Sequence, residues 1–288
     1  MKQRKIGDRH VSALGYGAMY LSVDGRPPQD HALHTLTAVI EVGLTFIDTA
    51  DVYGLDDRDI GHNERLIARA LRAAGPNQDA IVVATKGGRI RRGEGWGLDG
   101  RPVHLRRACE ASLRALGREP IDLYQLHRPD PQVPFEETIG TLADLQREGK
   151  IHLIGLSNVS SEELEAARRL ITVTSVQNKF NFWQRQDEEN GLLATCLEHG
   201  IAYLPYSPFG GGKRAGRLGE IAAVAQVAAR HGVTPYQVTL AWLLAKAPVI
   251  IPIPCSRRVE GVRENSRAAD CTLTVEDLRA LDAAVPPA

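Results

Sequence analysis

This sequence of 288 residues has few cysteines and no excess of either charge. Its four cysteines, Cys109, Cys196, Cys255 and Cys271, lie far apart and form no CxxC pair. We therefore expect free thiols in a reducing compartment and no disulfide framework. Lysine plus arginine and aspartate plus glutamate each number 35, so no strong electric field would attract nucleic acid or an anionic membrane. The charge balance favours a small-molecule partner.

Long hydrophobic runs are also absent. The first ten residues are mostly polar and have no apolar core of a signal peptide. The most apolar stretch, residues 239–254, is interrupted by Lys246 and three prolines and is too short to span a membrane. These features predict a soluble, cytoplasmic protein. The histidines do not group in pairs at ligand spacing, and His31 and His34 fall on the outer face of a predicted helix, so we expect no metal site.

Short apolar segments alternate with longer segments of helical period, and no linker rich in serine or proline divides them. Strands are predicted at residues 13–17, 46–48, 81–86, 121–127, 153–157, 175–178, 201–206 and 249–253. A helix is expected after each strand, and helix stops are expected at Gly43, Gly117, Gly149, Gly200 and Gly232. Eight such repeats favour a single domain over residues 1–288 that folds as a parallel (β/α)8 TIM barrel.

Two further elements are predicted near the ends of the sequence. Residues 2–6 and 10–12 flank Gly7-Asp8-Arg9, a pattern typical of a β-hairpin. This N-terminal β-hairpin would plug the amino-terminal end of the barrel. Residues 274–284 predict an extra C-terminal helix.

An open, doubly wound sheet is the main alternative fold. It would carry a GxGxxG dinucleotide fingerprint after the first strand, where this sequence has Gly15-Tyr16-Gly17-Ala18-Met19-Tyr20. The nearest approach, Gly210-Gly211-Gly212-Lys213-Arg214-Ala215, comes only at the seventh strand, and no Walker A pattern occurs. The missing fingerprint favours the barrel.

Polar residues stand at the carboxyl ends of the predicted strands, where barrel enzymes place their catalytic groups. The second strand ends in Asp48, with Tyr53 in the loop beyond it, the third ends in Lys86 and the fourth in His127. Each residue alone has a structural interpretation, such as an ion pair, a loop anchor or a core histidine. Together they suit proton transfer to a carbonyl oxygen: Tyr53 as acid, Lys86 stabilising its phenolate, Asp48 orienting Lys86, and His127 hydrogen-bonding the substrate.

The same motifs resemble those of the aldo-keto reductases. The segments that match are Phe46-Ile47-Asp48-Thr49-Ala50-Asp51-Val52-Tyr53-Gly54, Ala84-Thr85-Lys86 and Leu126-His127. The resemblance implies a carbonyl reductase in which these four residues are catalytic. It also implies that NADPH or NADP⁺ binds across the barrel mouth without a Rossmann domain, with NADH the weaker candidate.

The resemblance extends to segments that hold the cofactor in the family: Gly155-Leu156-Ser157-Asn158, Val176-Gln177-Asn178, Tyr206-Ser207-Pro208-Phe209-Gly210 and 253–265. Carried over residue by residue, it implies cofactor contacts by Gly17, Met19, Asp48, Ser157, Asn158, Gln177, Tyr206, Ser207, Phe209, Gly211, Ser256, Arg257, Glu264 and Asn265. One departure is Cys255, which replaces the usual glycine and requires a negative φ for the same backbone contact.

Arg257 and Arg258 precede a predicted helix, where guanidinium groups and free amides would suit the 2′-phosphate of NADP. Two solvated surface arginines are the alternative. The glycine- and arginine-rich residues 87–101 leave a similar choice: Arg91, Arg92 and Trp96 either close over an anionic or aromatic substrate or form a solvated loop.

Three segments look similar to bacterial family members near pyridoxal reductase: Leu14-Gly15-Tyr16-Gly17-Ala18-Met19, Gly155-Leu156-Ser157-Asn158-Val159 and Arg263-Glu264-Asn265. Two other functions stay open. One is an NADP(H)-binding sensor or regulatory subunit, and the other is a lyase with Lys86 as Schiff-base nucleophile, which the nearby Asp48 disfavours. We expect a monomer or a small homo-oligomer that acts on a small carbonyl compound.

Overall fold

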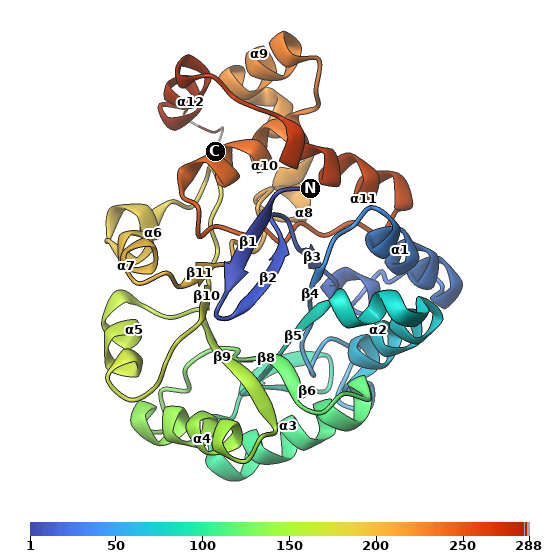
Figure 1. The fold of residues 1–288 in the computed structure, drawn as a ribbon, viewed down its shortest axis with the longest axis vertical. Coiled ribbons are helices and arrows are strands. Elements are labelled where there is room, and N and C mark those ends of the chain that lie inside the picture. The colour runs from blue at the N-terminus through green and yellow to red at the C-terminus, as the bar shows by residue number, and fades with distance from the viewer. Residues whose placement is uncertain (285, 287–288) are drawn as a thin grey trace.

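The computed structural model describes residues 1–284 and 286, excluding the side chains of 76 and 77. At its centre a parallel sheet has the strand order β11-β10-β9-β8-β5-β4-β3, and these strands curl around the middle of Figure 1. In chain order the strands are β3 (Tyr16–Gly17), β4 (Phe46–Asp48), β5 (Val82–Gly87), β8 (Ile121–Leu126), β9 (Ile151–Ser157), β10 (Ser175–Gln177) and β11 (Ala202–Tyr203). For each of these strands, at least one end lies within two residues of the corresponding end of a predicted strand.

Residues 249–254 close this sheet into a barrel. On one side the amides of Ile251 and Ile253 donate to the carbonyls of Tyr203 and Pro205, at 2.8 and 3.3 Å. On the other side the carbonyls of Pro252 and Pro254 accept from Gly15 and Gly17, at 2.9 and 3.0 Å. The prolines have no N–H to return to β3, so the segment pairs on both sides without a regular ladder. Residues 249–254 thus take the place of the predicted eighth strand without forming a regular strand, and the (β/α)8 barrel is confirmed.

The amino-terminal hairpin plugs the barrel as predicted. It consists of β1 (Gln3–Ile6) and β2 (Arg9–Ser12), which pair antiparallel. Ile6 and Val11 have no solvent exposure, and they pack with strand residues such as Phe46 and Leu123 inside the barrel. The Arg4 guanidinium donates to the carbonyls of residues 244, 247 and 250. This hairpin leaves only the carboxyl ends of the strands open to solvent.

The helices surround the barrel (Figure 1). They are α1 (Gln29–Glu41), α2 (His62–Ala73), α3 (Pro102–Leu116), α4 (Phe135–Arg147), α5 (Ser161–Arg168), α6 (Gln186–Glu189), α7 (Leu192–Glu198), α8 (Gly212–Ala215), α9 (Ala222–His231), α10 (Pro235–Lys246), α11 (Val259–Ser266) and α12 (Val275–Asp282). The five glycines predicted to stop helices all have φ between +62° and +79°. The extra C-terminal helix is α12, and Thr274 begins it with a capping box.

Residues 87–101 differ from the sequence expectation of a loop. They contain an antiparallel hairpin of β6 (Arg89–Arg92) and β7 (Gly95–Leu98). The turn between them includes Gly93, with φ +57°. The residues of this hairpin are partly or fully exposed. Its two strands contain only three large apolar residues, Ile90, Trp96 and Leu98, which is too weak a pattern to predict strands.

Candidate active site

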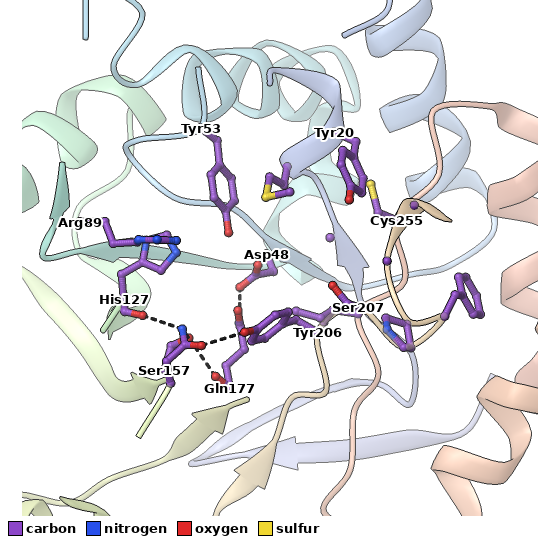
Figure 2. Close-up of a pocket in the computed structure, with 18 of the residues that line it drawn as sticks. Tyr20, Asp48, Tyr53, Arg89, His127, Ser157, Gln177, Tyr206, Ser207 and Cys255 are labelled. Atoms are coloured by element: carbon purple, nitrogen blue, oxygen red, sulfur yellow. Dashed lines mark hydrogen bonds between the residues drawn. The ribbon is translucent and has the colours of Figure 1, made fainter. Parts of the chain in front are cut away.

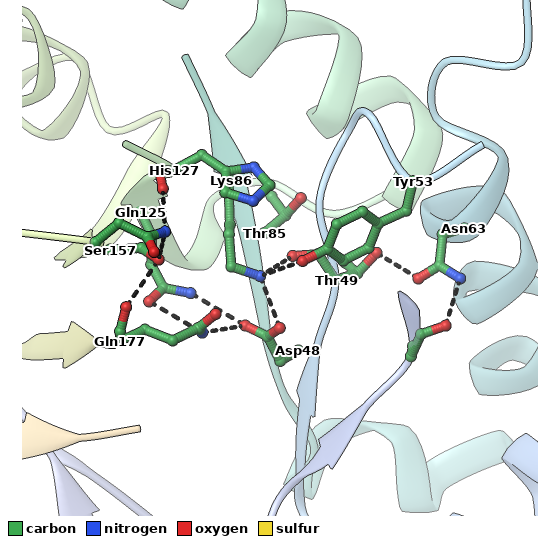
Figure 3. A network of polar contacts seen from close by, with 12 residues as sticks. Asp48, Thr49, Tyr53, Asn63, Thr85, Lys86, Gln125, His127, Ser157 and Gln177 are labelled. Carbon is green, nitrogen blue, oxygen red and sulfur yellow. Dashed lines mark hydrogen bonds and ion pairs between the residues drawn. The ribbon is translucent and has the colours of Figure 1, made fainter. Parts of the chain in front are cut away.

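The four polar residues predicted from the strand ends lie together at the carboxyl end of the barrel. Asp48 is the last residue of β4, Lys86 lies in β5, and His127 directly follows β8. Because β4 pairs with β5 and β5 with β8, these three residues come from neighbouring strands. Tyr53 reaches the same place from the loop after β4 (Figure 3).

Lys86 is the centre of this cluster and has no solvent exposure. Its Nζ donates to Asp48 Oδ2 at 2.6 Å, to the carbonyl of Thr49 at 2.7 Å and to Tyr53 Oη at 3.3 Å. An ammonium group has three N–H bonds, and each has an acceptor here. Since Tyr53 Oη accepts from Lys86, the phenol hydrogen is free to point at another group.

Burial and charge act in opposite directions on these side chains. Burial acts to lower the pKa of Lys86, but Asp48 and Tyr53 outweigh it and hold that pKa above its usual value. For Tyr53, burial raises the pKa above 10, and Lys86 lowers it only in part. Lys86 thus acts in the expected direction, but the net shift is upward. Both groups carry their protons at neutral pH.

Two glutamines complete the surroundings of Asp48. Its Oδ1 accepts from Gln177 Nε2 at 2.7 Å and from Gln125 Nε2 at 3.2 Å. Gln177 was expected to contact a cofactor, whereas Gln125 was missed. Gln125 lies opposite Lys86 in the β5–β8 register. Gln125 could have been predicted because it lies two residues before His127 on the same strand, and alternate residues of a barrel strand point inward.

His127 is buried, and one of its two ring nitrogens has no hydrogen-bond partner. Burial lowers its pKa well below 6.5, and Lys86, Arg89 and Arg128 lower it further. Its Nδ1 is buried without a hydrogen-bond partner. The ring meets that of Tyr53 edge to face, with centroids 5.8 Å apart. At neutral pH the imidazole is uncharged and has one N–H to donate.

The loop that carries Tyr53 is fixed by a buried asparagine. Asn63, with no exposure, accepts from Thr49 Oγ1 at 2.6 Å and donates to the carbonyl of Ala18 at 2.9 Å and to Ser22 Oγ at 2.7 Å. The backbone amide of Asn63 also donates to the carbonyl of Tyr53 at 3.3 Å. These contacts join the loops after β3 and β4 (Figure 3), so the position of Tyr53 depends on residues outside the predicted motifs.

A cavity of about 380 Å³ opens above this cluster. Tyr53, Asp48 and His127 form part of its wall, while Lys86 lies behind them. Figure 2 shows Tyr53 and His127 pointing into it, with Tyr206 and Gln177 on the adjoining wall. The cavity therefore presents a phenol and a neutral imidazole to any molecule that enters.

The chain was compared with known proteins. The model of the aldo/keto reductase family matches residues 13–286. The chain belongs to this family. An oxidoreductase of Schizosaccharomyces pombe is 36% identical over 96% of this chain and 88% of its own length, and a probable aldo-keto reductase of Glycine max is 34% identical over 98% and 88%. The structure of an aldo/keto reductase from Klebsiella pneumoniae with NADP and acetate has 28% identity and a TM-score of 0.81, covering 98% and 94% of the two chains.

Most of the residues predicted to hold the cofactor of this aldo/keto reductase lie around one cavity. Its lining includes Gly17, Met19, Asp48, Ser157, Asn158, Gln177, Tyr206, Ser207, Phe209 and Gly211. Gly17 has to be small, because a Cβ there would lie 2.9 Å from the carbonyl oxygen of Ile253. The same wall includes Tyr20, Arg89 and Arg128, which were not predicted from the sequence.

The wall fits a nicotinamide ring and a diphosphate. Asn158 Oδ1 accepts from Tyr206 Oη at 2.8 Å, which places a flat amide beside an aromatic ring. Asn158 and Ser207 are the non-glycine residues with positive φ in the described chain, at 59° and 49°, a strained conformation often found at binding sites. At Gly211 and Gly212 a Cβ would meet nothing within 4 Å. The backbone there is open to a ligand.

Ser256, Arg257, Glu264 and Asn265 do not line the cavity. They follow residues 249–254 and lie before or within α11. Arg257 is exposed and lies over the ring of Tyr20, its Cζ 5.3 Å from the centroid. Cys255 lines the cavity and has no positive φ. The negative φ that Cys255 needs in place of glycine is therefore present. Burial raises the pKa of its thiol to about 12.

The reductase shows no group of three or more His, Cys, Asp or Glu that could hold a metal ion within residues 1–284 and 286. His31 and His34 are exposed on α1. In the same part of the chain, no helix is both long and apolar enough to cross a membrane. The raised pKa of Lys86 is the opposite of what a Schiff-base nucleophile needs, so the geometry argues against the lyase.

Proposed function

We propose that this chain reduces an aldehyde or ketone to an alcohol, reversibly, with NADPH as the cofactor. The observation that carries the proposal is the Lys86 ammonium, which bonds both Asp48 and Tyr53 beneath a cavity that Tyr53 and His127 face. When bound, NADPH supplies a hydride to the carbonyl carbon. The residues of the chain then provide the proton and the orientation.

In this proposal Tyr53 donates its phenol proton to the carbonyl oxygen. Lys86 stabilises the resulting phenolate, and Asp48 keeps Lys86 charged and in place. The neutral His127 donates a hydrogen bond to the same oxygen, which fixes the face of the carbonyl that receives the hydride. The net change is one hydride to carbon and one proton to oxygen.

The proposed cofactor contacts follow the walls of the cavity. Tyr206 stacks on the nicotinamide ring, and Ser157, Asn158 and Gln177 bind its carboxamide. Gln177 has its amide nitrogen bonded to Asp48, so its carbonyl oxygen is the group left for the cofactor. Exposed Arg257 and Arg258 before α11 bind the 2′-phosphate of NADP. The Klebsiella relative was solved with NADP, which supports this cofactor.

Pyridoxal-like aldehydes are the proposed first substrates, from the similarity to pyridoxal reductase at residues 14–19 and 263–265. We place the protein in the cytoplasm, as a monomer or small homo-oligomer. The absence of net charge supports a small carbonyl substrate rather than nucleic acid.

The test is a fluorescence titration with NADPH and with NADH, followed by NADPH oxidation with pyridoxal and a panel of simple aldehydes. We expect tighter binding of NADPH and turnover of at least one aldehyde. Tight binding without turnover would favour a sensor or regulatory subunit instead. No binding of either nucleotide would overturn the cofactor assignment.

A further inference from the structure

Two arginines face the cavity beside the groups that would polarise the carbonyl. Arg89 begins β6 and Arg128 directly follows His127, and both belong to the cavity wall. Figure 2 shows the Arg89 side chain next to the His127 ring. Both guanidinium groups act to lower the pKa of His127. A substrate held by Tyr53 and His127 would therefore lie next to two positive charges.

Neither arginine is neutralised by the protein. In residues 1–284 and 286 no carboxylate forms an ion pair with Arg89 or Arg128. Arg89 Nε is buried without a hydrogen-bond partner, and Arg128 Nη2 donates to the neutral Asn158 Oδ1 at 3.0 Å. The one carboxylate on the cavity wall, Asp48, is already bonded to Lys86 and two glutamines. Buried donors without partners are rare in proteins, and this one belongs to a side chain on the cavity wall.

The hairpin β6–β7 holds Arg89 in place. Trp96 packs against two guanidinium groups, with Arg89 Cζ 4.9 Å and Arg91 Cζ 4.1 Å from its ring centroid. Arg91 is bonded to the carbonyls of Gly54 and Leu55, directly after Tyr53. Arg91 thus anchors the hairpin to the Tyr53 loop, Trp96 supports Arg89 at the cavity, and Arg92 is exposed away from it.

We propose that Arg89 and Arg128 form an anion subsite that selects carbonyl substrates bearing a carboxylate or phosphate group. Guanidinium groups bind such anions through paired, charge-assisted hydrogen bonds. This inference rests on the proposed reductase function and names its substrate class: aldehydes with an anionic substituent a few atoms from the carbonyl. A carboxylate and a phosphate would be bound through the same charge-assisted hydrogen bonds, and the substrates tested below distinguish between them.

The experiment compares kcat/KM for matched pairs of aldehydes: 4-oxobutanoate with butanal for a carboxylate, and pyridoxal 5′-phosphate with pyridoxal for a phosphate. The proteins are wild type, Arg89→Gln, Arg128→Gln and the control Arg92→Gln, which removes an exposed charge from the same hairpin. Thermal melting and the NADPH Kd of each protein are measured alongside. Arg128 is exposed, so its variant keeps the test valid if Arg89→Gln does not fold.

Wild type is expected to prefer the anionic member of at least one pair. Arg89→Gln and Arg128→Gln should each lower that preference by about tenfold or more, the usual effect of one charge-assisted hydrogen bond. Butanal turnover should fall much less than turnover of the anionic aldehyde, and the NADPH Kd of Arg89→Gln should be nearly unchanged. Arg92→Gln should behave as wild type. Equal losses for charged and neutral aldehydes, or a weaker NADPH Kd in Arg89→Gln, would overturn the subsite. If no aldehyde is turned over by any protein, the reductase function itself fails.

Discussion

Lys86 is a charged side chain without solvent exposure, and a buried charge costs several kcal/mol unless partners compensate it. Its three N–H bonds are matched by Asp48, the Thr49 carbonyl and Tyr53. This arrangement ties the stability of a buried ammonium to the position of a phenol. The residue that would assist proton transfer is thus fixed by the same contacts that allow it to be buried.

The lowered pKa of His127 leads to a prediction about pH. Its imidazole should stay uncharged throughout the neutral pH range, because burial and three nearby cations oppose its protonation. The pH profile of kcat/KM for aldehyde reduction should therefore be flat across the neutral range. It should decline only at high pH, where Tyr53, with a pKa raised above 10, loses its proton. An inflection near pH 6.5 that disappears in His127→Gln would contradict this assignment.

At this scale the sequence predicts residues that stand at strand ends. Asp48, Lys86 and His127 could be found because the carboxyl ends of parallel strands meet at one face. Asn63 and Arg89 could not be found, since one lies in a helix and the other in an unexpected hairpin. Their importance arises from packing between segments that are distant in the sequence.

At the scale of single elements, α12 depends on a charged capping group. The Asp277 side chain has no solvent exposure. Its carboxylate accepts from the Thr274 amide at 2.9 Å and from His231 at 2.7 Å, with Arg230 also bonded to it. Although burial acts to raise it, these hydrogen bonds lower the pKa of Asp277 from 3.8 to about 2. The folded state therefore binds this proton less readily than the unfolded state.

This shift fixes the sign of a stability prediction. A carboxylate whose pKa is lowered by folding stabilises the fold at pH values above its pKa in the unfolded state. This stabilisation is lost as the pH falls from 3.8 to about 2. Asp277→Asn should lower the free energy of unfolding by about 1–2 kcal/mol at pH 7, measured by urea denaturation. The difference from wild type should narrow towards about pH 3. A difference that does not change with pH would show that the charge of Asp277 has no part in it.

Elements with a strong local pattern were predicted, and those without one were missed. The buried strands and α12 have continuous apolar runs or caps. The β6–β7 hairpin is rich in arginine and glycine. It forms because Arg91 bonds the Tyr53 loop and because two arginines pack on Trp96. Such tertiary contacts override local propensity.

At the scale of the whole molecule, the barrel is closed by residues 249–254 and plugged by the β1–β2 hairpin. The barrel interior is thereby filled at the amino-terminal ends of the strands and open only at their carboxyl ends. Polar residues from successive strands converge at that open end, so one cavity receives both the proposed proton donor and most of the proposed cofactor contacts. The number of repeats could be read from the sequence, whereas the shape of the cavity depends on loops that bend over it.

The central claim is that Tyr53 delivers a proton to a carbonyl within this barrel, and one comparison tests it most directly. The kcat for NADPH oxidation by an aldehyde and the NADPH Kd are measured for wild type and for Tyr53→Phe. The account predicts that kcat falls by about 10²–10⁴-fold, the usual contribution of a general acid, while the Kd stays nearly the same. A Tyr53→Phe protein with near-normal kcat would contradict it.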